Sequence, residues 1–212
     1  MSMNKTWVLL LLLVIVIITG IAVPFIRQST LNSQLLHAIS FGATAGEVRD
    51  LIHRGADPNA GEASVYNTAL DRAIAGTDSD TIRVLLDAGA SVKPQGQAHT
   101  SPAILLACYN GPRGGLPDSN GYRILFTELR SHGASLEEKD SLGFTPLMRA
   151  VWSGNVAATK ALLALGANPR ARNNLGYMAL DMTAQSGGEE QIQIDNLLHA
   201  YRQAHPVSHV KH

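Results

Sequence analysis

Between residues 140 and 171 the chain places short apolar stripes between turn residues, a pattern that predicts two short helices. Thr145, with the proline after it, suits a helix start: its side chain can cap free backbone N–H groups, and proline at the first helical position loses no hydrogen bond. Gly154 ends that helix, and Asn155 can cap a second one, which Gly166 closes. Neither helix is long enough to be stable alone in water, so each must bury its stripe against neighbouring structure.

The same arrangement recurs along the chain with a period close to 33 residues. Gly143 and Gly176 lie 33 residues apart, and so do Gly133 and Gly166. Four apolar runs are each closed by Gly-Ala: LIHRGADPN, LLDAGASV, ELRSHGASL and LLALGANPR. A fixed period of this length is typical of stacked helical repeats, in which each copy buries its apolar face against the next.

The repeat over residues 140–171 resembles the ankyrin repeat. The residues that match that family's pattern in place are Gly143, Thr145, Pro146, Leu147, Ala150, Gly154, Leu162, Leu163, Gly166, Ala167 and Asn168. The resemblance covers roughly residues 32–201 and implies an all-α solenoid of about four to five helix-turn-helix repeats. Met148 departs from the pattern, because the family usually has histidine there and the turn contact of that histidine is lost.

An uncharged apolar run precedes the repeats. Residues 7–26 read WVLLLLLVIVIITGIAVPFI, and twenty helical residues at about 1.5 Å each span roughly 30 Å, the thickness of a hydrocarbon core. We predict one transmembrane helix here, so that residues 1–27 form an N-terminal anchor. The alternative is a signal peptide cleaved after Ala22, where small residues have suitable spacing. The apolar run continues past that point to Ile26, which favours the anchor.

The charges beside the predicted span indicate an orientation. Lys5 and the N-terminal amine precede it, and Arg27 follows it. The positive-inside rule then favours a cytoplasmic N-terminus, which predicts a single-pass protein of the cytoplasmic (inner) membrane with its repeat domain in the periplasm or otherwise outside the cytoplasm.

The rest of the chain divides into a linker, the repeats and a tail. We predict a short polar linker over 28–33, the repeat domain over 34–203 and a tail over 204–212. Within the repeats, residues 111–120 read GPRGGLPDSN and form an inserted loop, for which a binding role and a tolerated surface insertion are both open. The tail carries three histidines, but no cysteine or carboxylate lies near them, so a disordered tail is favoured over a metal site.

Composition and motifs argue against several classes of function. Lysine plus arginine equals aspartate plus glutamate, at 17 each, whereas a nucleic-acid binder normally carries a basic excess. The single Cys108 permits no internal disulfide and suits a small core position.

The sequence holds no motif typical of an active site. There is no phosphate-binding glycine loop and no nucleophile motif. Asp71, Asp140 and Asp181 recur near turns, where aspartate caps helices or pins turns. We therefore expect no enzyme activity, no cofactor and no metal.

The ankyrin resemblance implies a binding surface made of finger-like turns and the exposed sides of the first helices. The residues that the pattern places on this surface are Tyr66, Asp71, Arg72, Ser141, Leu142, Phe144, Arg149, Trp152, Asn174 and Tyr177. Trp152 and Arg149 are the strongest candidates, because tryptophan, tyrosine and arginine dominate interface energetics. We predict a membrane-anchored protein–protein interaction module for an unidentified protein partner. The alternatives are a structural subunit of a membrane complex, and a secreted or periplasmic ankyrin binding or immunity protein formed by signal-peptide cleavage.

Overall fold

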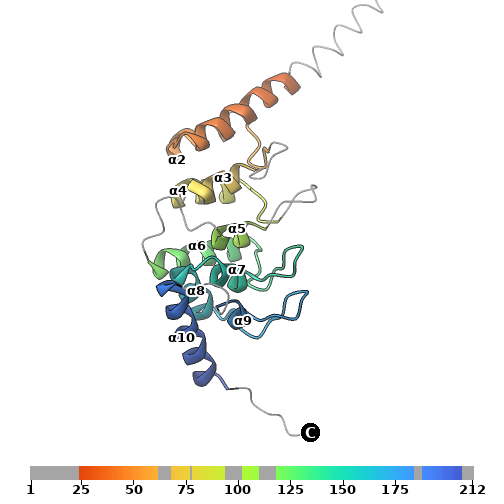
Figure 1. The fold of residues 1–212 in the computed structure, drawn as a ribbon. Coiled ribbons are helices and arrows are strands. Elements are labelled where there is room, and N and C mark those ends of the chain that lie inside the picture. Colours follow the sequence, from red (N-terminus) through yellow and green to blue (C-terminus); the bar gives the residue numbers. More distant parts are fainter. Residues whose placement is uncertain are drawn as a thin grey trace, which may run out of the picture.

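The protein is an array of helix pairs stacked one after another (Figure 1). The computed structural model describes residues 24–61, 68–76, 78–93, 102–109, 118–183 and 188–206. In these ranges the chain is helical and holds no strand, apart from one isolated bridge between Gly61 and Thr68. The pairs are residues 24–40 with α2 (Ala45–His53), α3 (Ala69–Gly76) with α4 (Ser79–Asp87), α5 (Ala103–Tyr109) with α6 (Ser119–Ser131), α7 (Pro146–Trp152) with α8 (Val156–Ala164), and α9 (Ala179–Thr183) with α10 (Glu189–Ala204).

The fourth pair forms where the sequence predicted it. The Thr145 hydroxyl accepts a hydrogen bond from the Met148 N–H at 3.3 Å and caps α7. The Asn155 side chain accepts one from the Ala158 N–H at 2.9 Å and caps α8. Gly166 follows α8 with φ of +87°, the left-handed conformation that glycine adopts at little cost. Each predicted start and stop of this repeat is therefore confirmed.

The first described helix is longer than the sequence indicated. It occupies residues 24–40 without a break, so residues 28–33, the predicted linker, are helical. Leu31 is buried in the core, and the Asn32 side chain accepts a hydrogen bond from the Asp57 N–H at 2.8 Å. This segment is thus packed against the first turn of the array.

Most of the predicted membrane segment, residues 7–23, lies outside the described residues. Among the helices that are described, none combines the length and the apolar character that crossing a bilayer requires.

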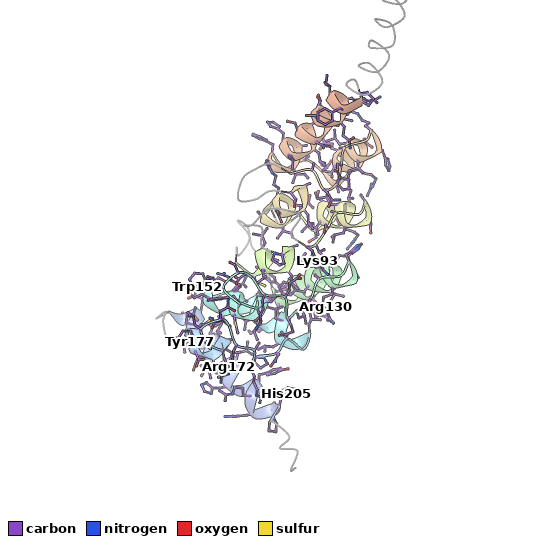
Figure 2. The ribbon with its side chains drawn as sticks, turned by 90° about the vertical axis from the view of Figure 1, so that its right-hand side faces the viewer. Lys93, Arg130, Trp152, Arg172, Tyr177 and His205 are labelled. Carbon is purple, nitrogen blue, oxygen red and sulfur yellow. The ribbon has the colours of Figure 1, made fainter. Side chains whose placement is uncertain are left out.

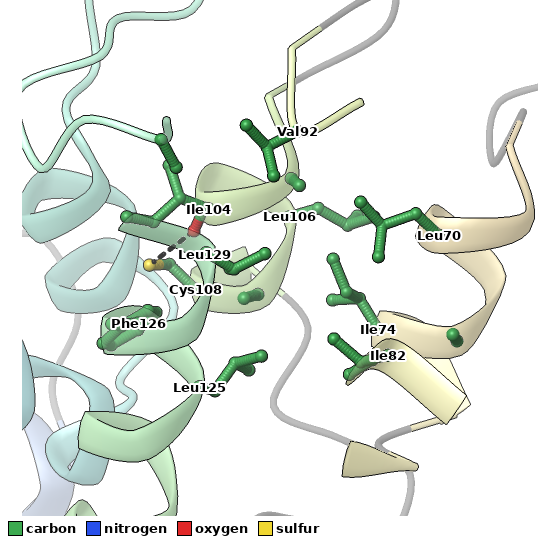
Figure 3. Close-up of a cluster of buried hydrophobic side chains, with 14 of the residues drawn as sticks. Leu70, Ile74, Ile82, Val92, Ile104, Leu106, Cys108, Leu125, Phe126 and Leu129 are labelled. Atoms are coloured by element: carbon green, nitrogen blue, oxygen red, sulfur yellow. Dashed lines mark hydrogen bonds between the residues drawn. The ribbon is translucent and has the colours of Figure 1, made fainter. Parts of the chain in front are cut away.

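The core runs through the stack between consecutive pairs. Figure 3 shows Leu70 and Ile74 of α3 facing Leu106 of α5 and Leu129 of α6. Cys108 lies in the same layer, fully buried, and its thiol donates a hydrogen bond to the Ile104 carbonyl at 3.1 Å. Burial raises the pKa of the Cys108 thiol well above its ordinary value. Cys108 is therefore the small core residue that the sequence predicted.

The third pair differs from its prediction at one helix start. The segment predicted to be an inserted loop ends at Asn120, yet α6 already begins at Ser119. The Asp118 side chain accepts a hydrogen bond from the Gly121 N–H at 2.9 Å and caps this helix. Residues 111–117 of that segment lie outside the described residues.

Polar side chains join consecutive pairs across intervals close to the repeat length. The Asn59 side chain accepts from the Ser91 N–H at 2.8 Å and donates to the Gly89 carbonyl at 3.1 Å. The Asn155 amide donates to the Tyr122 hydroxyl at 2.8 Å. Burial raises the pKa of Tyr122, so this phenol stays neutral and accepts that bond.

Candidate functional site

A single carboxylate organises the turn before α7. Asp140 Oδ1 accepts hydrogen bonds from the Leu142 N–H at 2.9 Å and the Phe144 N–H at 3.0 Å. Its other oxygen pairs with the Arg149 guanidinium, which donates from Nε at 2.7 Å and also from Nη2. Asp140 therefore pins the turn, as the sequence predicted, and also connects it to α7.

The Arg149 guanidinium lies against two aromatic rings. Its guanidinium carbon is 4.4 Å from the centroid of the Phe144 ring and 5.4 Å from that of Trp152. The two rings are themselves 6.0 Å apart and tilted by 60°. Arginine is attracted to the negative faces of both rings. The sequence predicted that Phe144, Arg149 and Trp152 contribute to one surface, and the structure brings all three together.

Phe144, Arg149 and Trp152 differ in how far their side chains are exposed to solvent. The side chains of Arg149 and Asp140 are only 15% and 7% exposed, and Phe144 packs partly buried against the core. Trp152 remains 43% exposed. Arg149 and Phe144 therefore contact the Trp152 ring from the buried side of the group, and Trp152 is the most exposed of the three.

The turn before α9 is held by a side chain in the same way as Asp140 holds the turn before α7. The Asn173 side-chain oxygen accepts from the Leu175 N–H and the Tyr177 N–H, each at 2.9 Å. Asn174 joins this turn to the preceding one, because its N–H donates to the Leu142 carbonyl at 3.2 Å and its side chain to the Ser141 carbonyl at 3.1 Å. The two turns therefore form one fixed unit.

Large apolar side chains are exposed on this unit and at the end of α7. Their exposed fractions are 57% for Leu142, 43% for Trp152, 77% for Leu175 and 47% for Tyr177. Figure 2 shows Trp152 and Tyr177 on the same side of the molecule. We call these four residues the finger surface. Leu175 was not among the residues predicted from the sequence, although it stands 33 positions after Leu142 and the repeat period alone could have identified it.

The predicted residues of the second repeat do not join the finger surface. Asp71 is buried and exchanges hydrogen bonds with Thr68, whose N–H and hydroxyl lie 3.1 Å from Asp71 Oδ2 and N respectively. Arg72 donates from Nη1 to the Leu36 carbonyl at 3.3 Å and to the Ser40 hydroxyl at 2.7 Å. These bonds cap α3 and hold it to the end of the first helix. Tyr66 lies outside the described residues.

The recurring aspartates have structural partners. Asp181 accepts a hydrogen bond from the Met178 N–H at 2.7 Å at the start of α9, as Asp71 and Asp140 do at their own turns. The predicted capping and turn roles of all three are confirmed.

Comparisons with known proteins agree with the repeat structure. Residues 142–174 match the family model described as Ankyrin repeat. Over 60 residues the chain is 37% identical to an ankyrin repeat protein of Neisseria meningitidis serogroup B (strain ATCC BAA-335 / MC58). That match covers 28% of this chain and 24% of the relative, so the matched part spans about a quarter of the length of that protein. Together with the stacked helix pairs, these comparisons support an ankyrin repeat over residues 142–174, and this repeat includes Leu142 and Trp152 of the finger surface and also Phe144 and Arg149, which contact the Trp152 ring.

Proposed function

We propose that this protein is a membrane-anchored interaction module that binds a partner protein through the finger surface. The observation that carries the proposal is the group of four exposed apolar side chains, Leu142, Trp152, Leu175 and Tyr177. Several large apolar side chains exposed on two joined turns and the end of α7 are better explained by binding than by folding, since exposed apolar residues that occur singly are common and need no explanation. Tryptophan and tyrosine are also the residues that contribute most at protein interfaces.

The rigidity of the finger surface supports the same proposal. Trp152 is held by the Phe144 ring and the Arg149 guanidinium, and Asn174 fixes the two turns to each other. Side chains that are already ordered lose little conformational entropy when a partner binds. The surface therefore has the properties of a preformed binding site.

Two cations next to the fingers indicate the charge of the partner. The Lys139 ammonium donates to the Arg172 carbonyl at 2.9 Å, and the Arg172 guanidinium donates to the Gly176 carbonyl. Within the described residues neither side chain pairs with a carboxylate. We therefore favour a partner segment with apolar side chains for the fingers and carboxylates beside them.

A site-specific cross-linker tests this surface. A photoreactive phenylalanine at position 175 is expected to form one discrete adduct with a partner in cells, and Trp152→Ala in the same chain should abolish it. The same cross-linker at Ile124 or Ile192, both exposed on α6 and α10, serves as the matched control and should give none. Equal adducts from all three positions, or an adduct that survives Trp152→Ala, would place the binding site elsewhere.

Residues 7–26 are the proposed anchor, and the proposed location is the cytoplasmic membrane with the array on the outer side. The apolar run supports the anchor, and its last residues Phe25 and Ile26 are exposed at the start of the helix over 24–40. Protease added to spheroplasts should digest the array. Protection until lysis would place it in the cytoplasm, and a soluble digestible array would indicate a cleaved signal peptide.

Replacing residues 7–26 with an unrelated leucine-rich span tests whether this segment is only an anchor. Partner binding in cells should be kept, whereas its loss would favour a structural subunit of a membrane complex.

A further inference from the structure

Three side chains that can bind a metal meet between the second and third helix pairs. Asp87 is the last residue of α4, and Glu128 and His132 lie one turn apart at the end of α6. Each offers one ligand atom, and these atoms all lie within 4.8 Å of one another. We call Asp87, Glu128 and His132 the triad.

The helices that carry the triad are fixed by the core. α4 and α6 follow one another along the stack (Figure 1). Leu86, next to Asp87, is buried, and so are Phe126 and Leu129 on either side of Glu128. A metal ion would therefore require only side-chain rotation, because the backbone positions are already set.

The electrostatics of this place favour a cation. Asp87 ends α4, and Glu128 lies in the last turn of α6, where the partial negative charge of a helix C-terminus disfavours carboxylates and stabilises cations. Glu128 Oε1 lies 3.9 Å from His132 Nε2 and 4.0 Å from Arg83 Nε. The Asp87 carboxylate forms no ion pair with any other described residue. The charge of Glu128 is thus only partly offset, by contacts of about 4 Å, and that of Asp87 is not offset by an ion pair within the described residues.

We propose that the triad is a zinc site that joins α4 to α6. One imidazole nitrogen and two carboxylate oxygens, with water as the fourth ligand, form a tetrahedral Zn²⁺ set at about 2.0–2.2 Å. Ligand atoms in such a set are roughly 3.4 Å apart, so rotations that move them by about 1 Å complete it. The imidazole selects Zn²⁺ over Ca²⁺ and Mg²⁺, which need more oxygen ligands than two carboxylates supply.

This site was not expected from the sequence. Asp87 and Glu128 are 41 positions apart and belong to different repeats, and only Glu128 and His132 are close enough in sequence to form a local motif. The proposed site connects the outer helices of neighbouring pairs, so zinc would stabilise the array at the third pair.

Isothermal titration of Zn²⁺ into the full-length chain tests the site. One zinc is expected to bind the unmodified chain, and Glu128→Gln and His132→Gln should each weaken binding by about tenfold or more. The matched control is His199→Gln on α10, since His199 forms a similar pair with Asp195, four residues earlier at 3.7 Å, but belongs to no group of three in the described residues. That variant should bind zinc as the unmodified chain does.

A second variant distinguishes lost ligands from lost structure. Arg83→Gln removes the cation that competes for Glu128 and should strengthen zinc binding, which damage to the fold would not do. Zinc should also raise the melting temperature of the unmodified chain and of Arg83→Gln, but not of His132→Gln. Unchanged affinity in the triad variants, an equal loss in His199→Gln, weaker binding in Arg83→Gln, or Ca²⁺ binding as tight as Zn²⁺ would each overturn the proposal.

Discussion

Gly143 lies where the turn before α7 contacts the turn before α9. Its φ is +78°, and a Cβ there would lie 2.3 Å from the Asn174 side-chain oxygen and 2.7 Å from the Asn174 backbone nitrogen. We expect Gly143→Ala to lower the free energy of unfolding by about 2–4 kcal/mol. The left-handed backbone costs an alanine about 1–2 kcal/mol, and its Cβ would also clash with Asn174, so that the backbone of one turn must shift. Gly176→Ala is the matched control, since Gly176 has φ of +84° and nothing within 4 Å. Urea unfolding measures both, and equal losses would show that the contact with Asn174 is unimportant.

We expect Arg149 to contribute more to stability than to direct binding. Its removal leaves the Asp140 carboxylate, 7% exposed, without its cation. Breaking a buried pair from one side costs about 3–5 kcal/mol, so we expect Arg149→Ala to lose about 3 kcal/mol. Trp152→Ala should lose only about 1 kcal/mol, because Trp152 is 43% exposed and lies outside the buried core. Chemical denaturation of the two variants checks this order. A binding defect in Trp152→Ala with unchanged stability would separate the two roles, and equal stability losses would contradict them.

At the scale of residues, the sequence predicts the role of a side chain, such as holding a turn, better than it predicts which other side chains it contacts. Asp140 was predicted to pin its turn and does so, but its pairing with Arg149 depends on how α7 folds back over the turn. Arg72 was predicted to be on the surface because the repeat pattern places it there. In the structure its guanidinium instead donates to the Leu36 carbonyl and the Ser40 hydroxyl near the end of the first helix, a contact between neighbouring pairs that no periodic pattern could show.

At the scale of elements, the capping box of α2 gives a pH-dependent contact. The Thr44 N–H donates to Glu47 Oε2 at 2.8 Å, the Thr44 hydroxyl donates to the same oxygen at 3.0 Å, and together they lower the pKa of Glu47. A lowered pKa in the folded state means that this stabilisation is complete above the ordinary value of about 4.3 and is lost as pH falls through the lowered pKa. The Thr44 amide NMR signal should titrate with a midpoint below about 4.3, and Glu47→Gln should abolish that titration. A midpoint at or above the ordinary value would contradict the cap.

Predicted helix boundaries succeeded where the start and stop residues are local. The fourth repeat carries its own caps, Thr145 and Asn155, and both helices begin where those residues indicate. The start of α6 was missed because its cap, Asp118, stands in a stretch rich in glycine and proline that reads as loop. The helix over 24–40 was missed because a charge at Arg27 and polar residues after it look like a linker, although Leu31 turns inward to the core.

At the scale of the whole molecule, each helix pair is held by its neighbours. Bonds such as that from Asn155 to Tyr122 connect adjacent pairs, and the core passes from one pair to the next without a central layer. The stability of such an array is approximately a sum of repeat and nearest-neighbour terms. A destabilising substitution in a middle pair should therefore let the pairs on either side of it unfold in separate transitions. A substitution at an exposed site should leave a single unfolding transition.

Leu129 in the third pair provides that test. It is fully buried between the second and third pairs, and a leucine-to-alanine change in a core costs about 2–5 kcal/mol. In a Trp7→Phe background, Trp152 fluorescence reports the fourth pair alone and circular dichroism reports all helices. For Leu129→Ala we expect the two signals to change at different urea concentrations, because the N-terminal and C-terminal pairs no longer unfold together. Ile124→Ala, an exposed position on the same helix, should keep them coincident. Coincident curves for Leu129→Ala would mean that the array unfolds as one unit even when its middle is weakened, and that its coupling extends beyond nearest neighbours.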